Sequence, residues 1–252
     1  MSIIISLTSH GRRIHETAHI AVASLLNQSV QADKVVLWLD EPPSVALLAM
    51  DGLEIRQCES IRSYKKLIPA LREFPNDVIV TADDDLHYPN DWLECIVEEH
   101  RCDPDCIVGH YIADFTKEGM LNFNSWSYKF DKYVPYDAIE EAAFPRPASG
   151  CGMLVPSAEV FYQDYNREDL FMNLAPTDDE LWWWAMAFLK KTKYRKTKRN
   201  WMPWDHYIVT GDNAGGSSLW SYNQTGPYIA QRKAVLEYYP TLREQIESIV
   251  YY

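Results

Sequence analysis

The chain has no long hydrophobic run and few cysteines. Its longest apolar segment, residues 181–189 (LWWWAMAFL), spans nine residues, whereas a helix that crosses a bilayer needs about 20. At the amino terminus only Ile3 to Ile5 are apolar before a polar stretch begins, a pattern unlike a secretory signal. Five cysteines in 252 residues fit reduced thiols better than a disulfide framework. We therefore expect a cytoplasmic protein.

Positive charge is also scarce. The chain has 24 Lys and Arg against 36 Asp and Glu, a formal net charge of −12, which argues against nucleic acid as a partner. The exception is residues 190–199 (KKTKYRKTKR), which hold seven basic residues and no acidic one. This stretch has two interpretations: a solvated loop, or a patch that contacts anionic lipid at the inner membrane or a polyanionic acceptor.

Cysteine and histidine side chains gather between residues 95 and 110, at Cys95, His100, Cys102, Cys106 and His110. Their spacing matches no zinc motif. The residues CIVGHYI from position 106 read as a strand, in which alternate side chains face opposite sides. We expect buried thiols and a loop here rather than a zinc site.

Strand and helix patterns alternate over the first 110 residues. Apolar and β-branched runs predict strands at 3–7, 34–39, 53–58 and 78–82, and helical spacing predicts helices at 15–27, at 64–74 and from Pro89. This alternation predicts an α/β fold with a mostly parallel, Rossmann-like twisted sheet flanked by helices. The sequence lacks a Walker A segment and a GxGxxG turn after a strand, so neither a P-loop NTPase nor a dehydrogenase is supported.

The second half of the chain is less regular. Residues 120–136 are rich in aromatic side chains and fit no single element. Further on, the pattern predicts a glycine-flanked strand within 148–156, an apolar helix at 179–191 and a terminal helix at 228–252 that breaks near Pro240. Because neither an internal repeat nor a linker-like segment interrupts the chain, we expect one domain.

Three consecutive carboxylates, Asp83, Asp84 and Asp85, follow the strand at 78–82. In open parallel sheets ligands bind beyond the carboxyl ends of the strands, and residues 8–13 occupy the equivalent position after the first strand. A helix cap would account for one Asp of the run, whereas adjacent like charges need a compensating cation. Mg²⁺ and Mn²⁺ take oxygen ligands from one or two carboxylates and from substrate phosphates. We therefore expect Mn²⁺ or Mg²⁺ bridging a diphosphate.

A second acidic cluster precedes the Trp-rich helix, in residues 175–184 (APTDDELWWW). Thr177 or Asp178 can cap that helix, and acidic residues in its first turn interact favourably with the helix dipole. A carboxylate at a helix amino terminus that opens on a cleft can also act as a general base toward an acceptor hydroxyl. The sequence alone leaves both interpretations open.

Seven segments, in order, resemble the GT-A glycosyltransferases, and most closely the bacterial family-two-like sugar transferases of surface-polysaccharide (capsule and lipopolysaccharide) biosynthesis. They are 6–14 (SLTSHGRRI), 24–28 (SLLNQ), 64–70 (YKKLIPA), 79–89 (IVTADDDLHYP), 150–156 (GCGMLVP), 175–182 (APTDDELW) and 219–223 (LWSYN). The resemblance implies a single GT-A-like domain over 1–252, with a nucleotide-sugar-binding half at 1–115 and an acceptor-side half at 116–252.

The resemblance also implies which residues hold the nucleotide sugar. Thr8, Arg13 and Lys66 would bind the nucleotide, with Lys65 as an alternative to Lys66. The segment that contains Gly150 and Gly152 would lie under the donor sugar and the acceptor.

In the same family the D-x-D motif holds the metal, which here points to Asp83 and Asp85. Asp85 would be the direct ligand of Mn²⁺ or Mg²⁺, and Asp84 would lie near the ribose. His206 would be a further metal ligand, and the loop at 211–216 would close over the diphosphate, although a surface turn explains both equally well.

The acid pair before the Trp-rich helix would carry the general base, which the match places on Asp179 and a frame shifted by one places on Asp178. The implied reaction is inverting transfer from a nucleotide diphosphate sugar, which we expect to be a UDP-sugar, to a glycan or lipid-linked glycan. Two other classes stay open. A metal-dependent nucleotidyltransferase or phosphohydrolase would need no sugar acceptor, and a non-catalytic glycan-binding module would need no metal.

Overall fold

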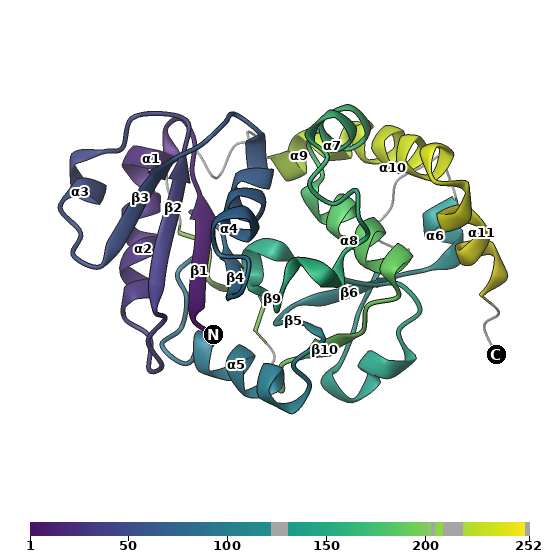
Figure 1. Ribbon diagram of the computed structural model, residues 1–252, viewed down its shortest axis with the longest axis horizontal. Helices are drawn as coiled ribbons and strands as arrows, with labels where there is room; N and C mark the ends of the chain where they lie inside the picture. Colours follow the sequence, from purple (N-terminus) through teal and green to yellow (C-terminus); the bar gives the residue numbers. More distant parts are fainter. Residues whose placement is uncertain (122–130, 200, 203–204, 209–218, 250–252) are drawn as a thin grey trace.

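The computed structural model describes residues 1–121, 131–199, 201–202, 205–208 and 219–249 (Figure 1). The strands are β1 (Ile3–Thr8), β2 (Lys34–Leu39), β3 (Leu53–Gln57), β4 (Val78–Ala82), β5 (Ile107–Gly109), β6 (Ile112–Phe115), β7 (Asp131–Tyr133), β8 (Pro145–Pro147), β9 (Met153–Val155) and β10 (Tyr194–Lys196). The helices are α1 (Arg13–Glu16), α2 (Ala18–Leu26), α3 (Val45–Leu48), α4 (Ile68–Glu73), α5 (Trp92–Cys102), α6 (Lys117–Leu121), α7 (Glu168–Leu174), α8 (Asp179–Lys190), α9 (Leu219–Gln224), α10 (Pro227–Tyr238) and α11 (Pro240–Ser248). Short 3-10 turns are η1 (Arg62–Lys66), η3 (Tyr136–Glu141), η4 (Ser149–Cys151) and η5 (Ala158–Val160).

A seven-stranded sheet in the order β10-β5-β9-β4-β1-β2-β3 forms the centre of the fold. Its neighbouring strands are parallel except for β9, which runs antiparallel between β4 and β5. The predicted mostly parallel sheet is therefore confirmed. From β1 the chain passes outward to β2 and β3 and then returns to β4 on the other side of β1. Strand order thus reverses between β1 and β4, the point at which such sheets bind ligands.

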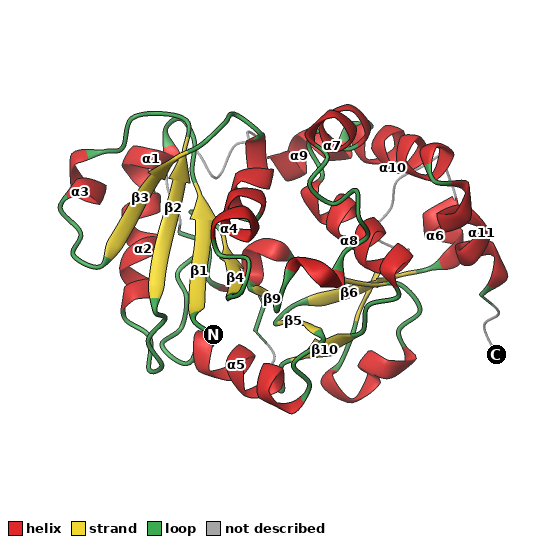
Figure 2. Cartoon of the chain, in the orientation of Figure 1, coloured by secondary structure: helices red, strands yellow, loops and turns green. Residues whose placement is uncertain are grey.

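Helices cover both faces of this sheet (Figure 2). Because successive side chains of a strand point to opposite faces, neighbouring residues of β1 belong to different parts of the core. Ile5 packs in one cluster with Val22 of α2 and Ile96 of α5, whereas Ile4 packs in another with Leu71 of α4. The second cluster also contains the apolar face of α8, so that both acidic segments are anchored to the same core.

The predicted helices exist, but two of them begin or break where the sequence did not indicate it. The helix predicted at 15–27 is interrupted at Thr17, between α1 and α2. The helix predicted at 64–74 starts as the 3-10 turn η1 and becomes α-helical from Ile68. Pro69 explains the second boundary, because proline is tolerated in the first turn of a helix and not further along it. The predicted break near Pro240 is confirmed.

The strand predicted at 106–112 is two strands, β5 and β6, separated at His110. The His110 ring is fully buried, with Nδ1 3.0 Å from Oγ1 of Thr197 and Nε2 2.9 Å from the carbonyl oxygen of Trp92. Burial lowers its pKa to about 3, so the ring is neutral. Within the described part of the chain, no three His, Cys, Asp or Glu side chains are grouped to hold a metal ion by themselves. The expectation of buried thiols and a loop holds for Cys106 alone: Cys95 is half-buried and Cys102 exposed, and both belong to helix α5.

The basic stretch at 190–199 is only partly a solvated surface. It contains β10, an edge strand that pairs with β5. Lys196 is fully buried, Arg195 pairs with Glu99 at 2.8 Å, and Arg199 pairs with Asp91. The interpretation as a simple loop is therefore wrong for its middle, where strand pairing takes up three residues. Four lysines of the stretch stay exposed, at positions 190, 191, 193 and 198.

Strands from both halves of the chain share the central sheet, since β9 and β10 lie beyond residue 116. The division at 115 is not a boundary in the sheet, and the single-domain assignment stays a prediction. Among the helices of the described residues, none has the length and apolar composition required to traverse a bilayer.

Candidate active site

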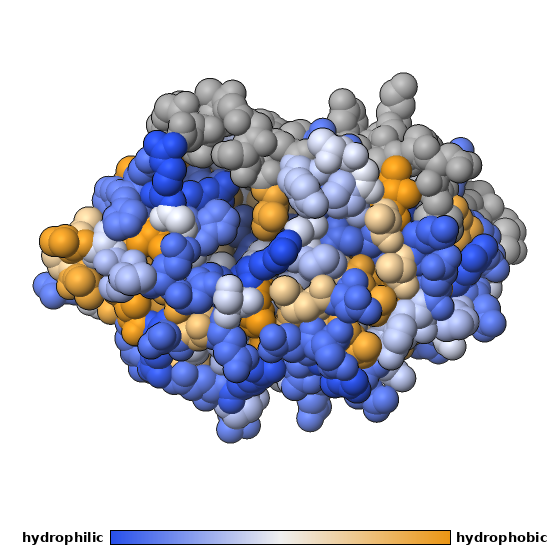
Figure 3. All heavy atoms as spheres, turned by 90° about the horizontal axis from the view of Figure 1, so that it is seen from above, coloured by the Kyte–Doolittle hydropathy of each residue, from blue (hydrophilic) through white to orange (hydrophobic). Residues whose placement is uncertain are grey.

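Strands β1 and β4 both end at the switch point. Residues 8–13 lie at the end of β1, and the Asp run follows β4. Both strands are buried and parallel, with Leu7 opposite Ala82, so their carboxyl ends present these segments at the same edge of the sheet. Figure 3 looks onto this edge and shows a hollow near its middle, bordered by hydrophilic side chains. The polar contacts of the site lie here.

Asp83 is the most exposed carboxylate of the run, with 37% of its side chain accessible. Its Oδ1 lies 2.5 Å from Nζ of Lys66, a buried amine. On its other side, a Cβ at Gly150 would lie 1.8 Å from Oδ2 of Asp83. The backbone of Asp83 is held as well, because its N–H donates to the Tyr88 hydroxyl at 2.7 Å. Asp83 is thus fixed from three directions.

Asp84 and Asp85 are buried and share one cation. Arg13 places Nη1 3.1 Å from Oδ1 of Asp84 and Nη2 3.1 Å from Oδ2 of Asp85. Ser9 also donates to Asp84 at 2.5 Å. Burial, together with the nearby charge of Asp83, raises the pKa of Asp85 to about 7 in spite of Arg13. The three carboxyl groups of the run thus have two cations beside them, Arg13 and Lys66.

The structure separates the two neighbouring lysines that the sequence left as alternatives. In the turn η1, Lys66 points to Asp83, whereas Lys65 pairs with Asp40, which follows β2. Burial disfavours the charge on Lys66, but the carboxylates around it, chiefly Asp83 and Asp179, together outweigh this and keep the Lys66 pKa above its ordinary value. Lys66 is therefore a charged amine at the Asp run, whereas Lys65 pairs with Asp40 at the end of β2.

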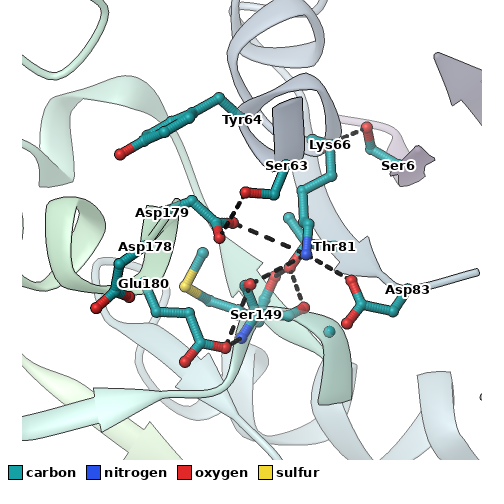
Figure 4. A network of polar contacts seen from close by, with 12 residues as sticks. Ser6, Ser63, Tyr64, Lys66, Thr81, Asp83, Ser149, Asp178, Asp179 and Glu180 are labelled. Carbon is teal, nitrogen blue, oxygen red and sulfur yellow. Dashed lines mark hydrogen bonds and ion pairs between the residues drawn. The ribbon is translucent and has the colours of Figure 1, made fainter. Parts of the chain in front are cut away.

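The second acidic cluster faces Lys66 from the opposite side (Figure 4). Asp178 caps α8, with Oδ1 accepting from the Leu181 N–H at 3.1 Å, and burial raises its pKa to about 6. Asp179, the first residue of α8, accepts from Ser63 at 2.9 Å through Oδ1 and places Oδ2 3.8 Å from Nζ of Lys66. That Oδ2 is buried and accepts no hydrogen bond from the described residues. The two interpretations of the cluster thus apply to different residues: Asp178 is the cap, and Asp179 faces the site.

The sequence analysis missed Glu180 and the residues that it joins. Its Oε1 accepts from the Ser149 N–H at 2.9 Å, and its Oε2 lies 3.1 Å from Nη1 of Arg146. Ser149 in turn lies 3.4 Å from Nζ of Lys66 through Oγ, and its carbonyl accepts from Thr81 of β4 at 2.6 Å. The turn η4 therefore ties the two acidic clusters together. The sequence did contain a sign of this role, because Glu180 directly follows Asp178 and Asp179 in one acidic triplet.

The buried carboxyl group of Glu180 should make the free energy of unfolding depend on pH. Burial, partly offset by Arg146, raises its pKa from 4.5 to about 7. The folded chain thus keeps a proton that the unfolded chain releases between these two values, so that the free energy of unfolding falls as the pH rises through this window. We expect wild-type protein to lose roughly 1–3 kcal/mol relative to Glu180→Gln between about pH 4.5 and 7.5, measured by urea unfolding. Identical pH slopes for the two proteins would contradict this.

The two glycines predicted under the substrates differ in what surrounds them. Gly150 touches the Asp83 carboxylate, whereas a Cβ at Gly152 would come within 2.8 Å of Trp92 and 2.9 Å of His110. Gly152 also has a φ of +110°, which a side chain disfavours. Core packing thus explains Gly152, and its role in binding stays a prediction.

Gly150→Ala tests the position of Asp83. The added methyl group displaces the Asp83 carboxylate from Lys66, so we expect Mn²⁺-dependent nucleotide binding to weaken at least tenfold, measured by titration calorimetry. Gly150 does not have a positive φ, so the substitution adds a methyl group without backbone strain and wild-type protein is the reference. Nucleotide affinity equal to that of wild type would show that the site tolerates a displaced Asp83.

Thr8 and His206 have backbones beside the site, but the side chain of each contacts other residues. The Thr8 hydroxyl donates to the Trp38 carbonyl at 2.8 Å. The His206 carbonyl accepts from the His87 N–H at 2.8 Å, beside the Asp run, but its ring stacks on Trp201 with centroids 5.0 Å apart. Among the described residues the His206 ring is not grouped with Asp83 and Asp85 into a metal site, so its role as a metal ligand stays a prediction. The loop at 211–216 lies outside the described residues.

Whether a divalent cation fits can be judged from the donor set. The described His, Cys, Asp and Glu residues form no closed three-ligand metal site, so Asp83, Asp85 and His206 as they stand do not make one. Asp83 and Asp85 nevertheless provide hard oxygen ligands for a cation completed by phosphate oxygens, as Mg²⁺ and Mn²⁺ prefer. The run places three carboxyl groups beside two cations, Lys66 and Arg13, so a divalent cation there would add positive charge where it is outnumbered. The residues fit a metal shared with a bound diphosphate.

Comparisons with known proteins give similarity of fold without a family. No family model matches this chain, and a search of curated proteins found no match. Residues 1–349 of S. aureus TarS, a GT-A glycosyltransferase, match with a TM-score of 0.56 and 12% identity, over 98% of this chain and 71% of that one. The 2-C-methyl-D-erythritol 4-phosphate cytidylyltransferase (IspD) of Francisella tularensis matches with a TM-score of 0.51 and 11% identity, over 88% and 99%. The chain therefore has a GT-A-like α/β fold.

Proposed function

We propose that this chain is a metal-dependent glycosyltransferase that moves a sugar from a nucleotide diphosphate sugar to an acceptor hydroxyl, with inversion. The main support is the position of Lys66, whose Nζ lies 2.5 Å from Asp83 and 3.8 Å from Asp179. The Asp run is suited to bind a diphosphate through a metal, and Asp179 is suited to accept a proton. Both lie beside the amine of Lys66. Sugar transfer uses both.

On the donor side, Asp83 and Asp85 would hold Mn²⁺ or Mg²⁺, which neutralises charge on the leaving diphosphate when bound. Lys66 and Arg13 are the cations beside the run, and both can donate charge-assisted hydrogen bonds to phosphate oxygens. Asp84 accepts from Ser9 and Arg13 and thereby orients the loop after β1. These residues bind and orient the part of the donor that departs.

On the acceptor side, Asp179 would take the proton of the attacking hydroxyl. Ser63 fixes its Oδ1, while Oδ2 accepts no hydrogen bond from the described residues and is free for that proton. Asp178 is engaged as the cap of α8, which supports Asp179 over Asp178 as the base. Lys66 Nζ lies 3.8 Å from Asp179 Oδ2, so the proposed base and the proposed phosphate-binding amine are neighbours.

A nucleotidyltransferase is the second candidate, because IspD has a similar fold and nearly its full length is covered. Such an enzyme would join a nucleotide to a phosphate and would not need a base at Asp179. The buried, hydrogen-bond-free oxygen of Asp179 is what favours sugar transfer. A phosphohydrolase and a non-catalytic glycan-binding module leave more of the site unused.

The finer assignments extend this proposal. The donor would be a UDP-sugar and the acceptor a glycan or lipid-linked glycan of a bacterial surface polysaccharide. The exposed lysines of the 190–199 stretch would allow peripheral contact of a cytoplasmic enzyme with the anionic inner membrane.

The test is release of nucleotide from a panel of nucleotide sugars with Mn²⁺, with and without glycan acceptors. A glycosyltransferase releases nucleoside diphosphate faster when its acceptor is present. Release of pyrophosphate from nucleoside triphosphate with a sugar phosphate would identify a nucleotidyltransferase instead. Glycan binding that needs no metal and gives no turnover would identify a binding module.

A further inference from the structure

Arg13 contacts Asp85, one of the two carboxylates proposed to hold the metal, and its neighbour Asp84. It begins α1 directly after the loop that follows β1, and its two terminal nitrogens each contact a different Asp at 3.1 Å. Only 29% of its side chain is accessible. Both Asp84 and Asp85 are nearly enclosed, with 5% and 12% of their side chains accessible. The guanidinium of Arg13 is therefore the cation that the fold places between Asp84 and Asp85.

A divalent cation bound to Oδ2 of Asp85 would stand next to the guanidinium of Arg13, whose Nη2 lies 3.1 Å from that oxygen. The two positive charges would repel each other across a few ångströms, so that each weakens the hold of the other on Asp85. A bound diphosphate changes this, because a guanidinium can exchange a carboxylate for two phosphate oxygens with similar geometry. Arg13 then counts as a phosphate ligand instead of a competitor.

We propose that Arg13 makes metal binding depend on the diphosphate: it competes with the cation for Asp85 in the ligand-free chain and moves to the phosphates when the nucleotide binds. This inference rests on the proposed function. Because coupling between two ligands is reciprocal, the same residue makes nucleotide binding depend on the metal. Free Mn²⁺ would bind weakly, and the pair would bind strongly.

Arg13→Gln tests this with a readout other than activity. Mn²⁺ alone is titrated into wild-type and variant protein at constant pH, and free Mn²⁺ is followed by electron paramagnetic resonance. We expect the variant to bind Mn²⁺ alone at least tenfold more tightly than wild type, while the factor by which UDP, GDP, CDP or dTDP tightens Mn²⁺ binding becomes smaller.

Arg12→Gln is the matched control. Arg12 precedes Arg13, carries the same charge, is exposed and pairs with Glu16 at 3.3 Å, so its loss should leave Mn²⁺ binding unchanged. Arg13→Lys keeps the charge but can contact one carboxylate well instead of two, so we expect an intermediate Mn²⁺ affinity. It also serves if Arg13→Gln fails to fold.

The outcomes separate this inference from the proposed function. Equal affinity of wild type and Arg13→Gln for Mn²⁺ alone, with nucleotide-dependent Mn²⁺ binding intact in wild type, would overturn the role of Arg13 and leave the transferase. Tighter Mn²⁺ binding in Arg12→Gln as well would show a general charge effect and also overturn it. No Mn²⁺ binding by wild type with any of the four nucleotides would overturn the proposed function together with the inference.

Discussion

Asp179→Asn should reduce sugar transfer by about 10²- to 10⁴-fold, the usual contribution of a general base. The amide keeps the size of the carboxylate and can still accept from Ser63, so the change removes the basic group and its charge pairing with Lys66. Nucleotide binding in the presence of Mn²⁺ should stay within about twofold of wild type, because Asp179 does not belong to the Asp run. Steady-state turnover and calorimetric titration of the nucleotide together measure the two effects.

Asp178→Asn is the control for this prediction. Asparagine caps helices as well as aspartate does, so the contact to the Leu181 N–H can persist and α8 should keep its start. We expect near wild-type turnover. If Asp178→Asn abolishes transfer and Asp179→Asn does not, the base is Asp178.

Asp85→Asn should have the larger effect, because it removes the carboxylate proposed as direct metal ligand and with it the electrostatic stabilisation of the leaving diphosphate. We expect transfer to fall more than about 10³-fold and the Mn²⁺ dependence of nucleotide binding to disappear. The fold should survive, since Asp85 is buried with a raised pKa and a neutral amide is easily accommodated at such a position.

Asp84→Asn provides the comparison within the same run. It removes one carboxylate that contacts Ser9 and Arg13 but leaves both proposed metal ligands in place. Nucleotide binding should weaken in this variant while still requiring Mn²⁺. Nucleotide binding by Asp85→Asn that stays Mn²⁺-dependent would remove Asp85 from the metal site.

The first four strands could be predicted because each is a short β-branched or apolar run bounded by polar turns, and α8 because its apolar residues continue for more than two turns. The Asp run could be placed at a strand end for the same reason. These features depend on local pattern, which a single sequence carries.

The rest depends on contacts between distant segments. Strand β9 enters the sheet antiparallel between β4 and β5, and no local pattern specifies that position. The choice between Lys65 and Lys66 depends on the direction of each residue in the turn η1. Glu180 gains its partners from Ser149 and Arg146, more than 30 residues earlier. Arg195 of the basic stretch likewise finds its partner, Glu99, almost a hundred residues earlier, so the sequence pattern did not show that this residue is part of a strand.

The most direct test of the proposed site is a thermal-unfolding screen of nucleoside diphosphates and nucleotide sugars, each with and without Mn²⁺. A nucleotide at a hundredfold its dissociation constant stabilises the folded chain by about 2.7 kcal/mol, which raises the melting temperature by several degrees. We predict such a shift with one nucleotide, only when Mn²⁺ is present, and its loss in Asp85→Asn. A melting temperature unchanged by every nucleotide, with and without Mn²⁺, would contradict a diphosphate–metal site at Asp83 to Asp85.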